Sequence, residues 1–237
     1  MQRAAFEFIE RVENLASANA VMTEIGAALR HRGIEHYLFS FVALPSETFA
    51  DVTLASALPV GLAKAYDELG LVHHDPGFRH SQRTARPFRW FKDVPYDPEA
   101  EPRAQEVVNF CRDFGLVDGV VVPFGTLARR LGQVWFGGPQ LDLQKRDIPA
   151  LHLMALYAFD RVLQIKGVAS TVTTLTARER EVLTRTAVGE KAEQIAVAIN
   201  VSRHTVVMHL NNCRRKLGAS TLAQAVAIAM GQRMIMP

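Results

Sequence analysis

The chain has 237 residues, and 27 lysines and arginines against 24 acidic residues give it a formal net charge of +3. A hydrophobic content of 49% is enough for one domain of roughly 165 residues and a smaller second one. The two cysteines, Cys111 and Cys213, exclude a disulfide framework, and the lack of an apolar run of about 18 residues argues against a membrane span, so we expect a cytoplasmic protein.

The first 165 or so residues carry both helical and strand patterns. Apolar periodicity predicts helices at residues 2–16, 18–31, 60–70, 75–84, 101–115 and 145–164. Alternation and β-branched residues predict strands at residues 37–44, 51–56, 117–125 and 131–137, the last two joined by a loop at Arg129 and Arg130. We therefore expect an α+β fold, with an N-terminal α/β/α sandwich whose central antiparallel sheet is covered by helices on both faces and can enclose a small ligand.

Two segments set the organisation of the chain. The stretch "IPALHLMALYAFDRVLQI" is more apolar than one buried stripe requires, so this helix is expected to contribute a homodimer interface. The residues after Lys166 are small, β-branched and uncharged, which is typical of a linker. The expected domains are residues 1–166 and 175–237, joined by a linker at 167–174.

Four short helices are predicted after the linker. The first, "TAREREVLTRTAVG", opens with a capping box of Thr176 and Glu179 and stops at Gly189. The others are "KAEQIAVAI", a helix from Ser202 to Gly218, and "LAQAVAIAM". A short helix, a tight turn and a second helix form helix-turn-helix spacing, in which the second helix enters the major groove of DNA.

The helix after Ser202 has two different faces. A period of about 100° per residue places Val206, Leu210, Cys213 and Leu217 on one buried stripe. The candidate DNA-contacting residues, outward or close to the outward face, are Arg203, His204, Thr205, Met208, Asn211, Asn212, Arg214, Arg215 and Lys216. Amides and guanidinium groups can read base edges, and the cations can neutralise phosphates. A solvated cationic face is the other interpretation of the same residues.

The basic charge is concentrated in this C-terminal part. From Leu175 onward there are nine lysines and arginines and four acidic residues, and no acidic residue follows Glu193. This part therefore carries +5 and the preceding 174 residues carry −2. A sequence-independent attraction to phosphate follows for the C-terminal end.

The motifs "LTAREREVL", "VSRHTV" and "RRKLG", with Gly189 and Ile195 between the first two, resemble the C-terminal DNA-binding module of the LuxR-type regulators. Many members of that family respond to acyl-homoserine lactone signals. The resemblance implies a helix-turn-helix over residues 175–235. Where the family has a lysine directly after the glycine, this chain has Glu190, with Lys191 one place later. A phosphate contact from position 190 therefore does not carry over.

The stretch "LPVGLAKAYDELGLVHHDPGFRHSQRTARPFRW" resembles the signal-binding segment of the same family. Tyr66, the pair Asp75-Pro76 and Trp90 match its pattern. The resemblance implies that Asp75 accepts the amide N–H of the ligand, and that Tyr66 and Trp90 pack against the acyl chain and the ring. A buried carboxylate needs a strong donor, and a ligand amide is one.

Three positions depart from the pattern of that segment. Leu62 stands where the family has a tryptophan that donates to the lactone carbonyl, and Leu58 stands where an aromatic residue commonly reaches the acyl carbonyl. Trp135 aligns with a small hydroxyl residue and is expected to take up cavity volume. A lost donor costs about 1–3 kcal/mol. The pocket therefore binds an ordinary lactone poorly, binds something less polar, or is filled by its own side chains. The candidate ligand-contacting residues are Leu58, Leu62, Tyr66, Asp75, Trp90 and Trp135.

Other constellations carry less weight. His73, His74 and His80 lack the spacing of a metal site, and no nucleophile turn surrounds Cys111, so we expect no metal, no catalytic residues and no cofactor other than a signal such as an acyl-homoserine lactone. The arginines at 83, 86 and 89 are expected to form a solvated or domain-contact surface.

The resulting expectation is a homodimeric transcriptional regulator and not an enzyme. Its expected partners are a duplex with an inverted-repeat operator, a small-molecule signal and RNA polymerase, and no membrane. One alternative is a regulator that has the same DNA-binding module but is ligand-independent or responds to another ligand. The other is a small-molecule-binding protein or enzyme whose basic tail serves only dimerisation.

Overall fold

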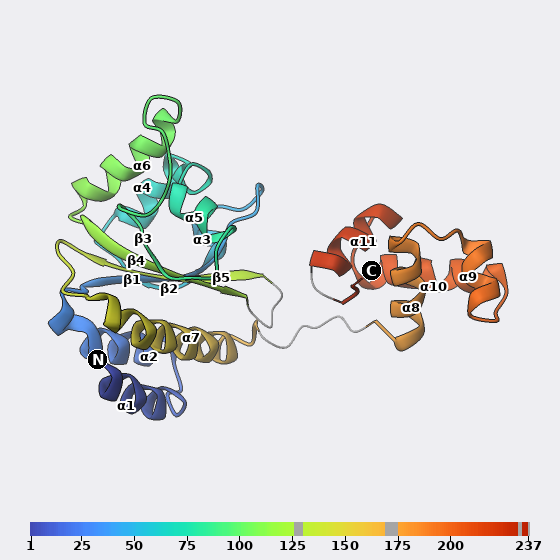
Figure 1. Cartoon of the computed structure of the whole chain (residues 1–237), viewed down its shortest axis with the longest axis horizontal. Helices are drawn as coiled ribbons and strands as arrows, with labels where there is room; N and C mark the ends of the chain where they lie inside the picture. Colours follow the sequence, from blue (N-terminus) through green and yellow to red (C-terminus); the bar gives the residue numbers. More distant parts are fainter. Residues whose placement is uncertain (126–129, 169–174, 232–233, 237) are drawn as a thin grey trace. The chain divides into compact units, whose positions relative to one another are not determined.

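The computed structural model describes residues 1–125, 130–168, 175–231 and 234–236. The chain divides into two compact units, the first holding Met1–Thr126 and Leu131–Ala169 and the second holding Ser170–Pro237 (Figure 1). Residues 169–174 of the predicted linker and Arg129 of the predicted loop lie outside the described residues. Within the described ranges, no helix is both long enough and apolar enough to cross a bilayer.

The first unit is built on a five-stranded antiparallel sheet with the strand order β2-β1-β5-β4-β3. The strands are β1 (His36–Phe41), β2 (Thr53–Ala57), β3 (Phe88–Arg89), β4 (Asp118–Gly125) and β5 (Leu131–Gly138). Strand β5 is central, and its Trp135 is paired with Leu38 of β1 on one side and with Val121 of β4 on the other. The predicted antiparallel sheet is confirmed.

Helices cover both faces of this sheet, as predicted (Figure 1). One face carries α1 (Gln2–Val12), α2 (Ala18–Leu29) and α7 (Ile148–Ile165). The other carries α3 (Phe49–Val52), α4 (Leu62–Glu68), α5 (Pro76–Ser81) and α6 (Pro102–Asp113). Single turns of 3-10 helix span Arg30–Arg32, Leu71–His73 and Lys145–Asp147.

The alternation of side chains along the strands separates two cores. Phe39, Phe41 and Phe124 surround Phe159 of α7 with ring centroids 4.8 to 6.2 Å apart, and they form the core beneath α7. Successive strand residues point to opposite faces, so the strand residues that alternate with these phenylalanines face α4 and α5. Leu38 on β1 is one of these. The second face of the sheet is therefore the floor beneath the helices α4 and α5.

Several predicted boundaries differ from the structure by a few residues, and two of the differences have a clear local cause. The predicted strand at 51–56 is wrong at its start, because Thr48 and Asp51 form a capping box and Asp51 and Val52 belong to α3. The predicted helix at 60–70 begins at Leu62, because Gly61 adopts a left-handed conformation with φ of 84°. The two-residue strand β3 is too short for alternation to reveal it.

The second unit contains α8 (Ala177–Ala187), α9 (Ala192–Ala198), α10 (Arg203–Lys216) and α11 (Leu222–Gly231), matching the four predicted helices. Cys213 belongs to an apolar cluster shared by α8, α10 and α11, and Val206 to a cluster shared by α8, α9 and α10. Leu210 packs against both clusters and Leu217 against the first. The predicted buried stripe of α10 is thus confirmed. Asn200 makes the turn before α10 in a left-handed conformation, which asparagine tolerates.

Candidate ligand pocket and DNA-binding surface

An apolar cavity lies between the floor of the sheet and the helices α4 and α5. The cavity has a volume of about 50 Å³, which is enough to hold a few water molecules. All six residues predicted from the sequence line it: Leu58, Leu62, Tyr66, Asp75, Trp90 and Trp135. The other lining residues are Leu38, Phe49, Gly77, Phe78, Cys111, Leu116, Val121 and Gln133. Tertiary structure thus brings the predicted set together, and their contact with a ligand stays a prediction.

Asp75 is held in this cavity by its place in the chain. It is the N-cap of α5, with Pro76 at the first helical position, and its carboxylate accepts a hydrogen bond from the Gly77 N–H over 2.6 Å. A Cβ on Gly77 would lie 2.2 Å from the Trp90 ring, so only glycine lets that indole pack here. The cap and the glycine together bring the carboxylate and the indole into contact.

Two further donors reach the Asp75 carboxylate from other elements. Tyr66 on α4 donates its hydroxyl to Oδ2 over 2.7 Å, and Trp90 donates its indole N–H to Oδ1 over 2.9 Å. The resemblance gave Tyr66 and Trp90 only apolar packing roles, so this polar role is an addition that the sequence did not reveal. Because each carboxylate oxygen can accept two hydrogen bonds, Oδ2 can still accept a second donor.

Burial sets the protonation of this group. Burial raises the pKa of Asp75 above its ordinary value of 3.8, while the hydrogen bonds from Tyr66, Trp90 and the backbone oppose that rise. Burial, followed by the neighbouring Asp75 charge, raises the pKa of Tyr66 well above 10.0. Tyr66 therefore keeps its proton and acts as a donor.

The three departures from the family pattern also have positions in the structure. Leu62, at the first position of α4, is buried and offers no donor. The ring of Trp135 lies over Gly137 and Gly119, since a Cβ on those residues would meet it at 2.0 and 2.9 Å. Part of the indole therefore lies where two side chains are missing, and the residue also lines the cavity. Its Nε1 donates to none of the described residues.

Sequence reasoning missed one polar lining residue, Gln133. It lies two residues before Trp135 on β5, so both side chains share one face of the strand. This spacing was the signal that could have revealed it. Gln133 also contacts Ser40 of β1 and Ser81 of α5, which gives the cavity wall a second polar group.

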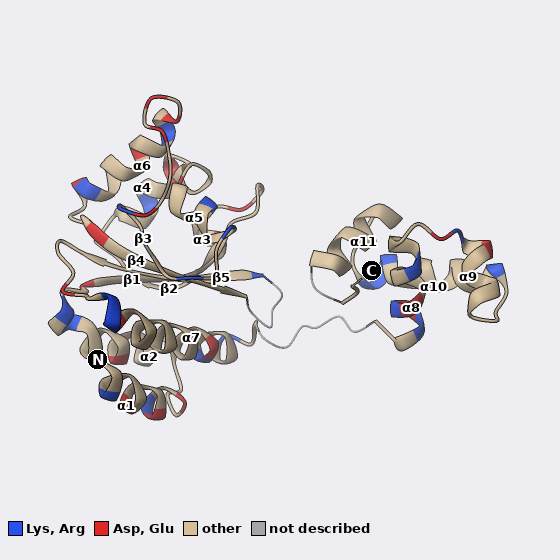
Figure 2. Ribbon diagram, viewed as in Figure 1, with Lys and Arg blue, Asp and Glu red and all other residues tan. Residues whose placement is uncertain are grey.

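The outward face of α10 presents the expected mixture of side chains. His204, Met208, Asn211 and Arg215 are exposed, and Thr205 and Asn212 are half-buried. Arg203 is exposed and pairs with Glu193 of α9. Lysines and arginines of this unit lie on α8, α10 and the start of α9, whereas α10 and α11 carry no acidic residue (Figure 2). This face can approach an anionic surface without charge repulsion.

The three cations at the end of α10 do not share one outward face, which corrects the expectation. Lys216 Nζ lies 2.7 Å from the buried carboxylate of Glu179. The Arg214 guanidinium donates to the backbone carbonyl of Ser220 and stays half-buried. Arg215 is exposed, and among the described residues its guanidinium donates to the Asn212 amide oxygen alone, over 2.9 Å. The helical twist of about 100° per residue separates these neighbours, so Arg215 is the best placed of the three for a duplex.

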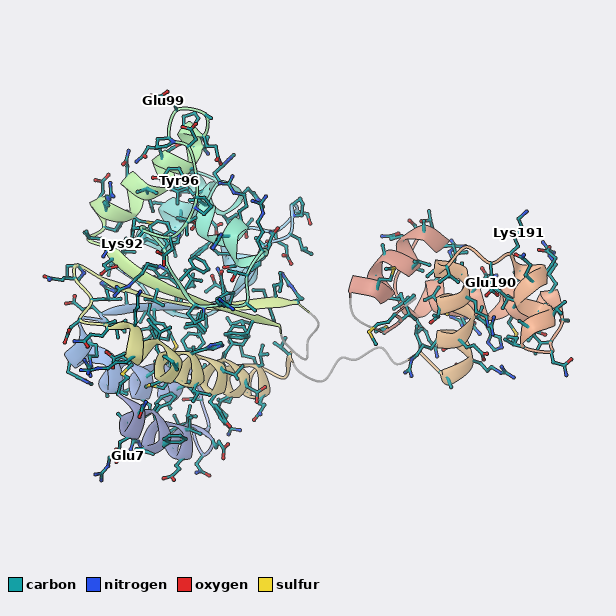
Figure 3. All side chains as sticks on the ribbon, in the orientation of Figure 1. Glu7, Lys92, Tyr96, Glu99, Glu190 and Lys191 are labelled. Atoms are coloured by element: carbon teal, nitrogen blue, oxygen red, sulfur yellow. The ribbon has the colours of Figure 1, made fainter. Side chains whose placement is uncertain are left out.

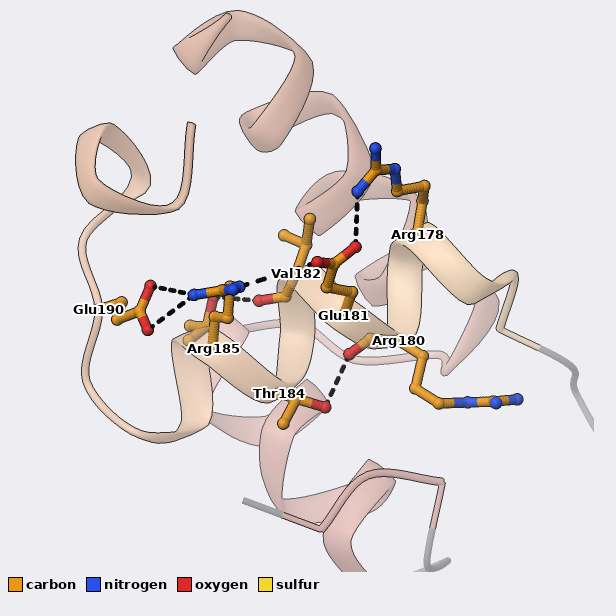
Figure 4. Close-up of polar contacts among 8 residues, drawn as sticks. Arg178, Arg180, Glu181, Val182, Thr184, Arg185 and Glu190 are labelled. Carbon is orange, nitrogen blue, oxygen red and sulfur yellow. Dashed lines mark hydrogen bonds and ion pairs between the residues drawn. The ribbon is translucent and has the colours of Figure 1, made fainter. Parts of the chain in front are cut away.

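The unusual Glu190 has a partner within its own unit. Arg185 Nη1 donates to both carboxylate oxygens of Glu190, at 3.1 and 3.2 Å (Figure 4). The same helix carries an ion pair of Arg178 with Glu181. Lys191, one residue on, is exposed and extends outward from the turn between α8 and α9 (Figure 3). Glu190 thus engages Arg185, and Lys191 is the cation that this turn presents.

The remaining candidates have ordinary structural surroundings. No group of three metal-ligating side chains occurs among the residues that the structure describes, and the His80 ring packs edge-on against Phe88. Burial raises the pKa of Cys111 well above 9.0, which keeps the thiol protonated. Arg89 pairs with Asp118 over 2.9 Å, so it does not form an open basic patch with its neighbours Arg83 and Arg86.

Comparison with known proteins connects both units to one family. Residues 17–162 match the autoinducer binding domain, and residues 173–229 match the bacterial regulatory proteins of the luxR family. The transcriptional activator protein BjaR1 of Bradyrhizobium diazoefficiens is 35% identical over 99% of this chain and 97% of its own length. The HTH-type quorum sensing-dependent transcriptional regulator RpaR of Rhodopseudomonas palustris is 30% identical over 96% and 93%. The structure of SdiA in complex with octanoyl-rac-glycerol superposes with a TM-score of 0.75 at 18% identity, covering 96% of this chain and 93% of that one.

Proposed function

Since the chain belongs to the LuxR-type quorum-sensing transcriptional regulators with an autoinducer-binding domain, we propose that the cavity beside Asp75 is its signal site. Members of this family regulate transcription and are not enzymes. The signal we propose is an N-acyl-homoserine lactone or a related small acyl amide. It acts in the cytoplasm, where the regulator meets its DNA.

The observation that carries the proposal is the Asp75 carboxylate in an apolar cavity. Leucines, phenylalanines and tryptophans make up most of the wall, so a ligand with an apolar body fits it. Among the described residues Tyr66 donates to Asp75 Oδ2, and a carboxylate oxygen can accept two hydrogen bonds. An amide N–H on the ligand would make a charge-assisted hydrogen bond there, which is stronger than a bond between neutral groups.

The donors around the cavity narrow the class of signal. Leu58 and Leu62 provide no hydrogen bond to a carbonyl, whereas the indole N–H of Trp135 has no partner among the described residues. We propose that this indole takes over the donor role that the family assigns to a tryptophan at position 62. The volume of about 50 Å³ favours a short or compact acyl group, because the side chains of the wall would have to move further for a long one.

One observation favours a second candidate, a regulator that needs no signal. Gly77, Tyr66 and Trp90 already satisfy the Asp75 carboxylate, so the fold does not depend on a ligand donor. A cavity with room for only a few waters is also compatible with a self-filled core.

The proposed mechanism of DNA recognition uses a homodimer. Leu153, Leu156 and Tyr157 of α7 are 40, 39 and 40% exposed, which is the apolar surface that a second copy can cover. Two copies of α10 would read an inverted-repeat operator, one half-site each. The relatives named transcriptional activators favour activation, with RNA polymerase as a further partner.

The deciding experiment purifies the full chain without signal and measures its oligomeric state and its binding to a palindromic duplex. A thermal-shift panel of straight-chain, branched and aryl homoserine lactones follows. A ligand at about 100 times its dissociation constant stabilises the fold by roughly 2.7 kcal/mol. The Asp75→Asn variant is the control, since it keeps the shape and removes the charged acceptor. Signal-free dimers that bind DNA, with no shift from any lactone, would favour the second candidate.

A further inference from the structure

Three buried polar side chains form a cluster in the wall of the apolar cavity. Gln133, Ser40 and Ser81 are 2, 0 and 1% exposed and come from β5, β1 and α5. The Ser81 hydroxyl donates to Gln133 Oε1 over 2.7 Å, and Gln133 Nε2 donates towards Ser40 Oγ over 3.4 Å. Gln133 lines the cavity directly.

The hydrogen bonds of this cluster leave a donor of Gln133 unused. A side-chain amide nitrogen carries two hydrogens. One points towards Ser40 at a distance beyond the usual 2.7–3.2 Å, and the second has no partner among the residues that the structure describes. A buried N–H without an acceptor is unfavourable, so this amide is suited to an acceptor that enters the cavity.

The cluster lies at a different end of the cavity from Asp75. Helix α5 begins after its N-cap Asp75 and ends at Ser81, the residue bonded to Gln133. Six residues of helix correspond to a rise of about 9 Å. Gly77 and Phe78, between the two ends, also line the cavity. The cavity thus offers an acceptor at one end of α5 and a donor at the other.

A purely structural role explains the cluster less well. A leucine at position 133 would fill the same place between β5 and α5 without burying an amide. The Ser81 hydroxyl instead fixes the orientation of Gln133 through Oε1, which leaves Nε2 as the group offered to the cavity.

We infer that Gln133, oriented by Ser81 and Ser40, recognises an oxygen on the ligand away from the amide that meets Asp75. The inference rests on the proposed function and specifies its ligand class: an acyl amide whose acyl group carries a keto or hydroxyl oxygen. A plain alkyl chain would leave the Gln133 N–H unpaired, so the site selects against it. Gln133 is a specificity-determining residue of this pocket.

The test measures the affinity of the full protein chain for three ligands whose acyl groups all have six carbons. They are N-hexanoyl-, N-(3-oxohexanoyl)- and N-(6-hydroxyhexanoyl)-homoserine lactone, measured by calorimetry. The wild-type protein is expected to prefer one oxygenated ligand over the plain one by about tenfold or more. In Gln133→Leu, the ratio of the two affinities should fall close to one. The oxygenated ligand should bind more weakly, and the plain ligand should bind equally well or more tightly.

Controls separate recognition from folding. Val134→Ala changes a buried residue of the same strand that faces away from the cavity, and it should keep the wild-type preference. If Gln133→Leu does not fold, Ser81→Ala takes its place and should reduce the preference in part. If lactones bind but the ratio of affinities for the oxygenated and the plain ligand is the same in the wild-type protein and in the Gln133 variant, the inference is overturned and the proposed function is not. Failure of all three ligands to bind the wild-type protein would overturn the proposed function, and this inference with it.

Discussion

Lys216 Nζ lies 2.7 Å from Glu179 Oε2, and this ion pair joins the last residue of α10 to the first turn of α8. Glu179 is buried and also accepts the Thr176 N–H over 2.8 Å in the capping box. The basic run at the end of α10 therefore contains a structural lysine beside an exposed arginine.

Replacing Lys216 by methionine is expected to destabilise the α8–α10 contact by about 1–3 kcal/mol, because it leaves the buried Glu179 without its charged partner. Hydrogen exchange of the amides in α8 and α10 of the full chain measures this local loss. The matched control is Arg215→Met, because the Arg215 guanidinium is exposed and donates to an amide oxygen of Asn212. This variant should change the free energy of local opening by less than about 0.5 kcal/mol. Unchanged exchange in the Lys216 variant would show that the pair adds nothing to the fold.

The same pair predicts a dependence on pH. Burial by itself would raise the pKa of Glu179, but the hydrogen bonds from Lys216 and Thr176 outweigh it and hold the pKa below its ordinary value of 4.5. The unfolded chain then binds more protons than the folded one, so this contribution is present above pH 4.5 and is lost as the pH falls through the lowered value. Hydrogen exchange gives the free energy of local opening of α8. The difference in this free energy between the wild-type protein and Glu179→Gln should be smaller below pH 4.5 than at pH 6. A constant difference would contradict this assignment.

Arg215 is expected to be the main cationic contact of α10 with DNA. Arg215→Ala should weaken specific binding by about 1–3 kcal/mol if the guanidinium reads a base. If it contacts only a phosphate, the variant should instead reduce the slope of log K against log salt by about 0.9. Titrations of a palindromic duplex at several salt concentrations separate these results. A variant that matches the wild-type protein in both quantities would place the duplex on another surface.

Restoring an indole at position 62 tests how the lactone ring is held. Leu62→Trp should raise the affinity for homoserine lactones by about tenfold or more, because it adds a second donor for the lactone carbonyl besides Trp135. Leu62→Phe is the control, since it adds an aromatic ring without an N–H. Calorimetry with one lactone and both variants distinguishes a donor effect from a packing effect. Equal affinities for the two variants would show that no carbonyl lies near this position.

Trp135 offers the complementary test on the opposite wall. Its indole N–H has no partner among the described residues, so Trp135→Phe should lower the affinity for a lactone by about tenfold while the unliganded protein loses little polar stabilisation. Thermal melting with and without ligand gives both quantities. A large drop in the melting temperature of the unliganded protein, with ligand affinity retained, would instead assign the indole a packing role over Gly137 and Gly119.

The sequence by itself determined the features that depend on local pattern. The helical period placed Val206, Leu210 and Cys213 on the buried stripe of α10, and the structure confirms it. The capping box at Thr176 defined the start of α8. The spacing of family motifs identified six residues that line one cavity, although they come from separate elements. Such features follow from neighbours along the chain, which a sequence displays directly.

Only the tertiary structure decided which partners these residues have. Asp75 receives donors from Tyr66 and Trp90, and Lys216 pairs with a glutamate 37 residues earlier in the chain. Strand alternation puts Gln133 and Trp135 on one face, but the packing of α4 and α5 decides that this face lines a cavity. A hydrogen bond depends on distances of about 3 Å between atoms of different elements, and helical or strand periods fix no such distance.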